Sequence, residues 1–227
     1  MVKRRLAAFN ELIAEIGKTR ESQGTFPALA RVFKIIKAHL FLVSDAILFA
    51  RSLDDTLPDV QLDDALTIRE ATMDDLVLFE PTSTPSEMMY IRTELAGEAR
   101  CLIALKNGQL ASYLWFTPQV VPSVHFLYLP LAPDEVYVYD GVTPPAFRRQ
   151  GIQRRLHEWM FHLLRESGYR RALTLVGVGN YPSLQMDSTL YRVIGRIVGI
   201  KVFRLMYFRY YPQVSGRPRR VTRWLGI

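Results

Sequence analysis

One stretch, residues 134–168, constrains the fold of this 227-residue chain more than any other. It begins with the β-branched and aromatic run Glu135–Tyr139, a composition typical of a strand. Pro144 and Pro145 end this strand, because proline cannot donate a hydrogen bond to a ladder. A basic loop containing Gly151 follows, and then a long helical pattern. The sequence therefore predicts a strand, a tight loop and a helix in direct succession.

The predicted helix has one apolar face, because its apolar residues recur at i, i+4, i+7 and i+8. They are Ile152, Leu156, Trp159, Met160, Leu163 and Leu164. Gly168 is the predicted C-terminal cap, with Arg165 in the last turn. A helix N-terminus carries unpaired N–H groups and the positive end of the dipole, so a glycine-containing loop that leads into it forms a site for a phosphate-like anion. Four arginines add positive charge there: Arg148, Arg149, Arg154 and Arg155.

The loop at Val142–Gln153 resembles the acyl-CoA-binding motif of the GNAT superfamily of N-acetyltransferases, Q/R-x-x-G-x-G/A. Arg148 matches the first position, Gly151 the central glycine and Phe147 the aromatic residue of the preceding turn. Gln153 departs from the pattern, in which Gly or Ala is usual, and so places a bulky polar side chain near the expected pyrophosphate. The alternative interpretation is a basic turn before an ordinary surface helix.

The order of elements around the loop is also similar to the GNAT plan, over roughly residues 64–211. Leu66–Glu70 alternates as a strand should, and Thr72 is a predicted helix cap. Asn107-Gly108 predicts a hairpin turn, and Arg171–Val176 a buried strand. The resemblance implies an α/β (α+β) fold, in which helices flank a mixed, mostly antiparallel central sheet and an N-terminal helical extension is added.

Two elements are predicted after residue 180. Pro182 and Ser183 open a helix that carries Leu184, Tyr191 and Ile194 and is closed by Gly195. Lys201–Tyr211 alternates and is predicted as the last strand.

The resemblance also implies which residues bind an acyl-CoA. A backbone N–H near Val142 or Thr143 is expected to donate to the thioester carbonyl. The residues expected to hold the pyrophosphate are Arg148, Arg149, Gln150, Gly151, Ile152 and Gln153. The segment that begins at Asn180 resembles the family's N-x-x-S/A … L-Y-x-x-x-G pattern. That match implies cofactor contacts from Asn180 and Ser183 and a general-acid role for Tyr191, the alternative being a partly buried structural tyrosine.

Acyl transfer to an amine needs a base, because only the neutral amine attacks. Asp140 and Glu135 on the central strand are the candidates, and solvated charges at a strand edge are the alternative for both. His157 and His162 are five residues apart and so share no helix face for a metal. The sequence predicts no metal site.

Composition limits the class of protein. The formal net charge is +7, with basic residues at both ends of the chain. It favours anionic partners such as CoA phosphates, acidic lipids, nucleic acid or an acidic carrier protein, and a solvated basic surface is the alternative. The chain contains one cysteine and neither a signal peptide nor a spanning segment is apparent, so we expect a cytoplasmic protein.

The predicted function is transfer of an acetyl or other acyl group from a CoA thioester to a primary amine, by direct attack in a ternary complex. Acetyl-CoA is the expected donor. One alternative is a longer-chain N-acyltransferase that uses acyl-carrier protein. Another is a non-catalytic module that binds acyl-CoA or an anionic surface, although no clear nucleic-acid or membrane partner is indicated.

Three segments are predicted: a helical extension at 1–63, the acyltransferase domain at 64–211 and a basic tail at 212–227. Short amphipathic helices need packing, so the extension must bury its apolar stripes against the core, in a homodimer or on a membrane. The apolar run Ala46–Ala50 favours packing on the core, where it would add a strand to the sheet.

Overall fold

The computed structural model describes residues 41–60, 65–119, 131–202 and 205–212. The predictions for residues 1–40 and for the tail after residue 212 lie outside these residues. The strands are β1 (Phe41–Ser52), β2 (Leu66–Glu70), β3 (Arg100–Lys106), β4 (Gln109–Thr117), β5 (Glu135–Val142), β6 (Arg171–Gly177), β7 (Arg192–Val202) and β8 (Leu205–Pro212). The α-helices are α3 (Leu76–Phe79), α4 (Pro85–Leu95), α6 (Ile152–Glu166) and α7 (Tyr181–Leu190), with short 3₁₀ turns at Met73–Asp75, Glu80–Thr82 and Pro145–Phe147.

The chain forms two compact units. Of the described residues, those within 44–198 and 209–212 belong to the larger unit, and those within 41–43 and 199–208 belong to the smaller. Every residue of the candidate site belongs to the larger unit.

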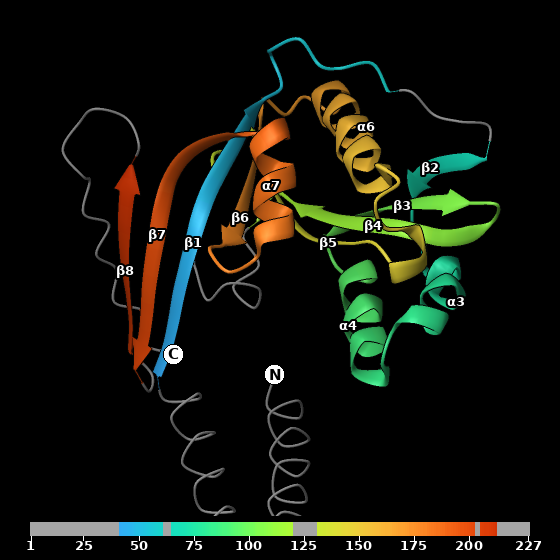
Figure 1. Cartoon of the computed structure of the whole chain (residues 1–227), viewed down its shortest axis with the longest axis horizontal. Helices are drawn as coiled ribbons and strands as arrows, with labels where there is room; N and C mark the ends of the chain where they lie inside the picture. Colours follow the sequence, from blue (N-terminus) through green and yellow to red (C-terminus); the bar gives the residue numbers. More distant parts are fainter. Residues whose placement is uncertain (1–40, 61–64, 120–130, 203–204, 213–227) are drawn as a thin grey trace, which may run out of the picture. The chain divides into compact units, whose positions relative to one another are not determined.

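The strands are hydrogen-bonded in the order β2-β3-β4-β5-β6-β1-β7-β8 (Figure 1). The pairs β2–β3, β3–β4, β4–β5 and β1–β6 are antiparallel, and β5–β6 is parallel. The predicted fold class, a mixed and mostly antiparallel sheet flanked by helices, is confirmed. Because β5 and β6 are parallel, the loops that follow them leave the same edge of the sheet.

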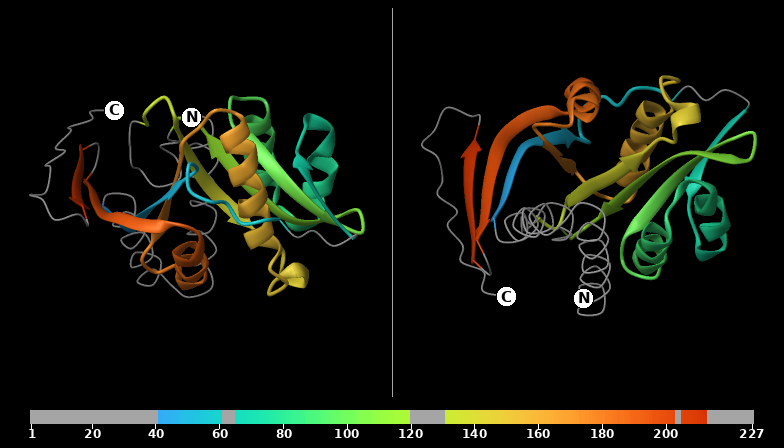
Figure 2. Two further views of the ribbon diagram at one scale, coloured as in Figure 1. Left: turned by 90° about the horizontal axis from the view of Figure 1, so that it is seen from above. Right: turned by 60° about the horizontal axis from the view of Figure 1, so that its bottom comes forward.

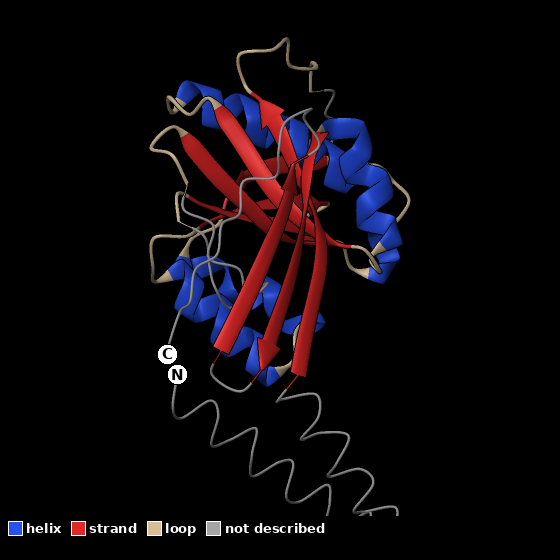
Figure 3. Cartoon of the chain, turned by 90° about the vertical axis from the view of Figure 1, so that its left-hand side faces the viewer, coloured by secondary structure: helices blue, strands red, loops and turns tan. Residues whose placement is uncertain are grey.

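Helices cover both faces of the sheet. Helix α6 packs against β3 and β4 on one face, and α3 and α4 contact the same two strands from the other (Figure 1). The two views of Figure 2 agree on this arrangement, and Figure 3 shows it by element type. Four residues of the predicted apolar stripe of α6 are almost fully buried: Ile152, Leu156, Met160 and Leu164. Their burial fixes α6, and hence the loop before it, on the sheet.

Several local predictions are confirmed. Asn107 and Gly108 turn the chain between β3 and β4. Thr72 caps the 3₁₀ turn that leads into α3, and Asp75 closes a capping box with it. Cys101 is buried in β3 as a small apolar residue, and this burial raises the pKa of its thiol. No helix in the described part of the chain has the length and apolar character of a membrane span.

The prediction for the end of the domain was wrong in two places. The helix predicted to run to Gly195 ends at Leu190, and β7 begins at Arg192. Lys201 and Val202 belong to β7, and β8 starts separately at Leu205. The physical reason is the β-branched content of the segment after Tyr191, which fits a pleated strand better than a helix.

The segment Ala46–Ala50 joins the sheet as predicted. It lies within β1, which pairs antiparallel with β6 from Ala46↔Gly177 to Ser52↔Arg171. Leu53, just after β1, is fully buried in the core. The division of the chain at residue 63 stays a prediction.

Candidate functional site at the end of β5

Strands β5 and β6 separate at their carboxyl ends. Their pairing runs from Glu135↔Arg171 to Val138↔Thr174. Beyond the last pair, β5 continues to Val142 and β6 to Gly177. The ladder between the two strands therefore ends before the strands do, and a ligand could enter between their carboxyl ends.

A β-bulge shapes the same end of β5. Tyr113 pairs with Val142 and Trp115 with Tyr139, so Asp140 and Gly141 together stand opposite the single residue Leu114. Asp140 has a left-handed backbone, with φ of 46°. A bulge bends its strand, which gives a physical reason for the separation from β6.

The basic loop enters α6 through a second left-handed segment. Arg149 has φ of 63°, and Gly151, which caps the helix, has φ of 72°. A Cβ added to Gly151 would meet no atom within 4 Å, so the space in front of the helix N-terminus is open. In the described residues, the non-glycine residues with positive φ are Asn107 in the hairpin turn, Asp140 and Arg149. Two of these three thus lie at this site, where backbone strain is often found in proteins.

The side chains of the loop are arranged around this opening. Arg148 Nε donates to the carbonyl of Thr143 at 3.0 Å. Gln150 accepts from Lys106 Nζ at 2.7 Å. Arg148, Arg149 and Gln150 are exposed, whereas Ile152 anchors the first turn in the core at 2% exposure. The structure thus brings the predicted phosphate-loop residues together at the helix N-terminus.

Asn180 and Ser183 lie at the neighbouring loop. Asn180 follows β6 and caps α7, where its side-chain oxygen accepts the Ser183 N–H at 3.4 Å. Parallel strands place this loop at the same edge of the sheet as the loop after β5.

Asp140 presents an exposed carboxylate at the bulge, on the side of α4. Tyr90 of α4 donates to its Oδ2 at 3.0 Å. Burial, with help from the charges of Asp140 and Glu94, raises the pKa of Tyr90. Tyr139, the neighbour of Asp140, donates to Glu94 at 2.9 Å, and burial followed by that carboxylate raises its pKa as well. Both tyrosines therefore stay protonated and act as donors to carboxylates.

Glu135 is not brought to this end of the strand. It is the first residue of β5, about 23 Å from Val142 at the usual rise of a strand. Its carboxylate pairs with Arg171 Nη2 at 2.9 Å and accepts the Ala132 N–H at 3.0 Å. Of the two candidate bases, Asp140 alone lies beside the opening.

Tyr191 lies in the interior. It is 4% exposed, and its hydroxyl is 2.9 Å from Nδ1 of His157 on α6. Its ring packs edge-to-face against those of His157 and Phe161. Burial lowers the pKa of His157 to about 3, so this imidazole is neutral at physiological pH.

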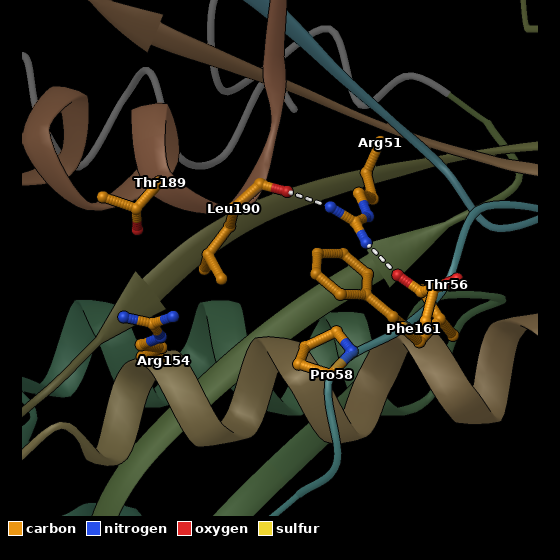
Figure 4. A pocket seen from close by; sticks show the side chains of 8 residues that line it. Arg51, Thr56, Pro58, Arg154, Phe161, Thr189 and Leu190 are labelled. Carbon is orange, nitrogen blue, oxygen red and sulfur yellow. Dashed lines mark hydrogen bonds between the residues drawn. The ribbon is translucent and has the colours of Figure 1, made fainter.

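A separate open pocket of about 300 Å³ lies between α6, the end of α7 and the segment after β1 (Figure 4). Its most buried charged group, Arg51, is already used: it donates to the carbonyls of Thr56 at 2.8 Å and Leu190 at 3.4 Å. Arg154 reaches the rim from the first turn of α6 and pairs with Glu158 at 2.9 Å. Because its arginines already have these structural partners, the pocket is a weaker candidate for chemistry than the opening beside β5.

Asp187 on α7 is a buried carboxyl group, 4% exposed, whose Oδ1 accepts no hydrogen bond from the described residues. Burial raises its pKa to about 7. Since the folded-state pKa exceeds the unfolded value, the stability linked to this group is complete below about pH 4 and is lost as the pH rises through 7.

Asp187→Asn should therefore raise the unfolding free energy by roughly 1–3 kcal/mol at pH 8 and by much less at pH 4.5. Urea denaturation at both pH values measures this, and an equal effect at both would contradict it.

In the described part of the chain, His, Cys, Asp and Glu side chains form no group of three that is arranged to hold a metal.

Sequence reasoning missed Ser112, His157 and Gly141 as parts of this region. Ser112 had a signal, because it is a polar residue within the otherwise apolar run of β4. His157 also had one, because it follows Leu156 on the apolar side of an amphipathic helix. Nothing local distinguishes Gly141, whose role depends on a contact with α6.

Comparisons with known proteins gave one family match and several similar structures. Residues 66–186, which are 121 of the 227, match the model of the Acetyltransferase (GNAT) family. Among curated proteins, nothing matches the chain. A Drosophila protein of known structure is 14% identical with a TM-score of 0.53, over 78% of this chain and 58% of its own. A putative GNAT-family acetyltransferase from Novosphingobium aromaticivorans is 15% identical with a TM-score of 0.49, over 69% and 63%. A ribosomal-protein-alanine N-acetyltransferase from Brucella melitensis is 16% identical with a TM-score of 0.45, over 56% and 90%.

At these identities the structural likeness concerns the fold alone. The chain spans 58% and 63% of the lengths of the first two structures that it matches.

Proposed function

The chain belongs to the GNAT acetyltransferase family, and from this premise we propose that it transfers an acetyl or other short acyl group from CoA to a primary amine. One observation carries the proposal: the separated end of β5 lies directly before an open, positively charged helix N-terminus. A thioester held in the opening and a pyrophosphate held at the helix would be two parts of one extended donor.

The residues present fit such a donor. The N–H groups at the start of α6, together with Arg148 and Arg149, favour a pyrophosphate. The end of β5 beyond its last pair with β6 offers backbone groups, that of Thr143 among them, to a pantetheine amide and to the acyl carbonyl. CoA supplies the activated acyl group as a thioester.

Asp140 is the proposed base. Its carboxylate stands at the bulge, and the hydrogen bond from Tyr90 holds one of its oxygens. In the step, the amine nitrogen bonds to the acyl carbon and the C–S bond breaks. Asp140 takes the proton lost by the amine, and the thiolate leaves with the electron pair of the C–S bond. Glu135 has no part in this step, since it lies at the far end of β5.

That Tyr191 donates a proton to the leaving thiolate stays a prediction drawn from the resemblance. Its hydroxyl is buried against His157, so the test is Tyr191→Phe. A loss in kcat of tenfold or more would support the role, and wild-type kcat would remove it.

Reversing the charge of Arg149 should weaken acetyl-CoA binding by about tenfold or more, because a carboxylate would then face the pyrophosphate. Gly151→Trp should weaken it further, because its ring would fill the open space before the helix. Isothermal titration with acetyl-CoA and with CoA measures both effects.

The matched control for that experiment is Arg165→Glu, which makes the same charge change at the other end of α6. We expect it to bind acetyl-CoA within about threefold of wild type, since only charges near the phosphate act strongly on it. If wild type binds neither acetyl-CoA nor CoA at high micromolar concentration, the proposal fails.

The donor and acceptor classes are part of the proposal and have their own assays. A thiol-release screen over amine classes identifies the acceptor. A mass-spectrometric search for copurified acyl species, with a binding assay for acyl-carrier protein, separates a short-chain CoA enzyme from a long-chain one. We also propose a cytoplasmic location, because a chain with one cysteine fits a reducing compartment.

A further inference from the structure

A chain of polar side chains runs from the bulge of β5 into the core beneath α6. Gln153 is its centre: its Oε1 accepts from the hydroxyl of Thr143 at 3.1 Å and lies within hydrogen-bonding distance of Ser112 Oγ, whose single proton is shared between this oxygen and the carbonyl of Val142. On its other side, Gln153 Nε2 lies 3.5 Å from Nε2 of His157, and His157 contacts Tyr191. The motif that predicted the phosphate loop has Gly or Ala in place of this glutamine, and neither could form these bonds.

The amide of Gln153 lies against the backbone of β5. A Cβ built on Gly141 would be 2.3 Å from Gln153 Nε2, far inside van der Waals contact. Glycine at 141 is therefore what allows the glutamine side chain to cross the strand at the bulge. The two residues form one packing unit that joins the first turn of α6 to the end of β5.

The same chain sets the direction of one peptide group. Ser112 Oγ donates to the carbonyl of Val142 at 3.0 Å and lies 2.9 Å from Thr143 Oγ1. A trans peptide is planar, with its C=O and N–H pointing in opposite directions. The N–H of Thr143 therefore points away from Ser112, and thus away from β4 and toward the side of β5 from which β6 has separated.

We propose that Gln153 is a positioning residue for acyl transfer: together with Ser112 and Thr143 it fixes the Val142–Thr143 peptide so that the Thr143 N–H meets the carbonyl oxygen of the acyl thioester. The inference rests on the proposed function. It adds a role for three side chains, whereas the phosphate is expected to bind to backbone N–H groups of the loop. His157 and Tyr191 support Gln153 from the core. A donor fixed before the reaction stabilises the charge that develops on this oxygen at no cost of reorientation.

The first test is Gln153→Met, which keeps the length of the side chain and removes its hydrogen bonds. We expect kcat to fall about tenfold to a hundredfold with KM for acetyl-CoA within threefold, because small misplacement acts on the transition state. Ser112→Ala should cause a similar loss, and the double variant little more than either alone. Gln185→Met on the exposed face of α7 is the control and should keep wild-type kcat. A Gln153→Met enzyme with wild-type kcat would overturn the inference.

A second test needs no amine acceptor. In protein labelled with ¹⁵N-threonine, the Thr143 amide signal is assigned by its disappearance in Thr143→Ser. Acetyl-CoA, which has the carbonyl, should shift this signal further downfield than CoA, which lacks it. In Gln153→Met that difference should vanish while acetyl-CoA still binds.

The outcomes separate the two proposals. If acetyl-CoA binds wild type but shifts Thr143 no more than CoA does, the inference fails and the proposed function stands. If Gln153→Met keeps the difference, the inference likewise fails alone. If acetyl-CoA does not bind wild type, both fail.

Discussion

Replacing Asp140 with asparagine is expected to lower kcat for acyl transfer by about 10²- to 10⁴-fold, the usual contribution of a general base. Asparagine accepts the hydrogen bond from Tyr90 through its amide oxygen and tolerates the left-handed backbone of this position. The variant should therefore fold normally and bind acetyl-CoA as wild type does. What it lacks is a group that can take the proton of the attacking amine.

Steady-state kinetics with the amine found in the thiol-release screen measures this effect, and titration with acetyl-CoA checks that donor binding is kept. Glu135→Gln is the matched control, since it makes the same chemical change at the other end of β5. It should stay within about threefold of wild-type kcat. If Asp140→Asn keeps wild-type kcat, or if the loss appears in Glu135→Gln instead, the assignment of the base is wrong.

Gly141→Ala is expected to lower the unfolding free energy by about 2–3 kcal/mol and to reduce kcat by at least tenfold. The added methyl group would meet Gln153 Nε2 at 2.3 Å and Leu114 Cδ1 at 3.1 Å. Gln153 can move away only by giving up its hydrogen bonds to Ser112, Thr143 and His157, each of which contributes about 1 kcal/mol. The same movement would release the Val142–Thr143 peptide, which is why stability and activity should fall together.

Urea denaturation and kinetics are the measurements, and a double variant gives the sharpest result. Gly141→Ala combined with Gln153→Ala should be only slightly less stable than Gln153→Ala alone, because the clash with Gln153 is gone and only the closer contact with Leu114 Cδ1 remains. Gly179→Ala is the control for the general effect of replacing a glycine with alanine, since a Cβ at residue 179 meets no atom within 4 Å. Fully additive losses in the double variant would show that the two residues do not form one packing unit.

Periodicity and turn chemistry were enough to predict the central elements. The hairpin at Asn107-Gly108, the strand from Glu135 and the amphipathic stripe of α6 are each set by residues close in sequence, and the structure confirms all three. The added strand at Ala46–Ala50 followed from its apolar run alone. The boundary between α7 and β7 did not follow, because residues 184–195 combine helical spacing with β-branched content. Pairing with the rest of the sheet determines that the residues after Tyr191 form a strand and not a helix.

The loop that enters α6 was predictable because glycine, arginine and a helix start lie within a few residues of one another, and its binding of phosphate stays a prediction. The link between Ser112 and Gln153 was not, since these residues are 41 positions apart and meet only through the register of β4, β5 and α6. The bulge at Asp140 and Gly141 sets that register. A single aspartate within an otherwise strand-like sequence does not reveal that the strand contains a bulge. Likewise, the burial of Tyr191 against His157 depends on how α6 and the end of α7 pack.

The central claim is that an acyl-CoA binds in the opening beside β5 with its pyrophosphate at the start of α6. Amide hydrogen exchange of the full chain, with and without saturating acetyl-CoA, tests this claim most directly. Exchange should slow at two segments, Tyr139–Thr143 and Arg149–Gln153, and Arg149→Glu should lose the protection at the second. Binding of acetyl-CoA that leaves both segments unchanged, or that protects only residues 53–58 and the end of α7 around the pocket of Figure 4, would contradict it.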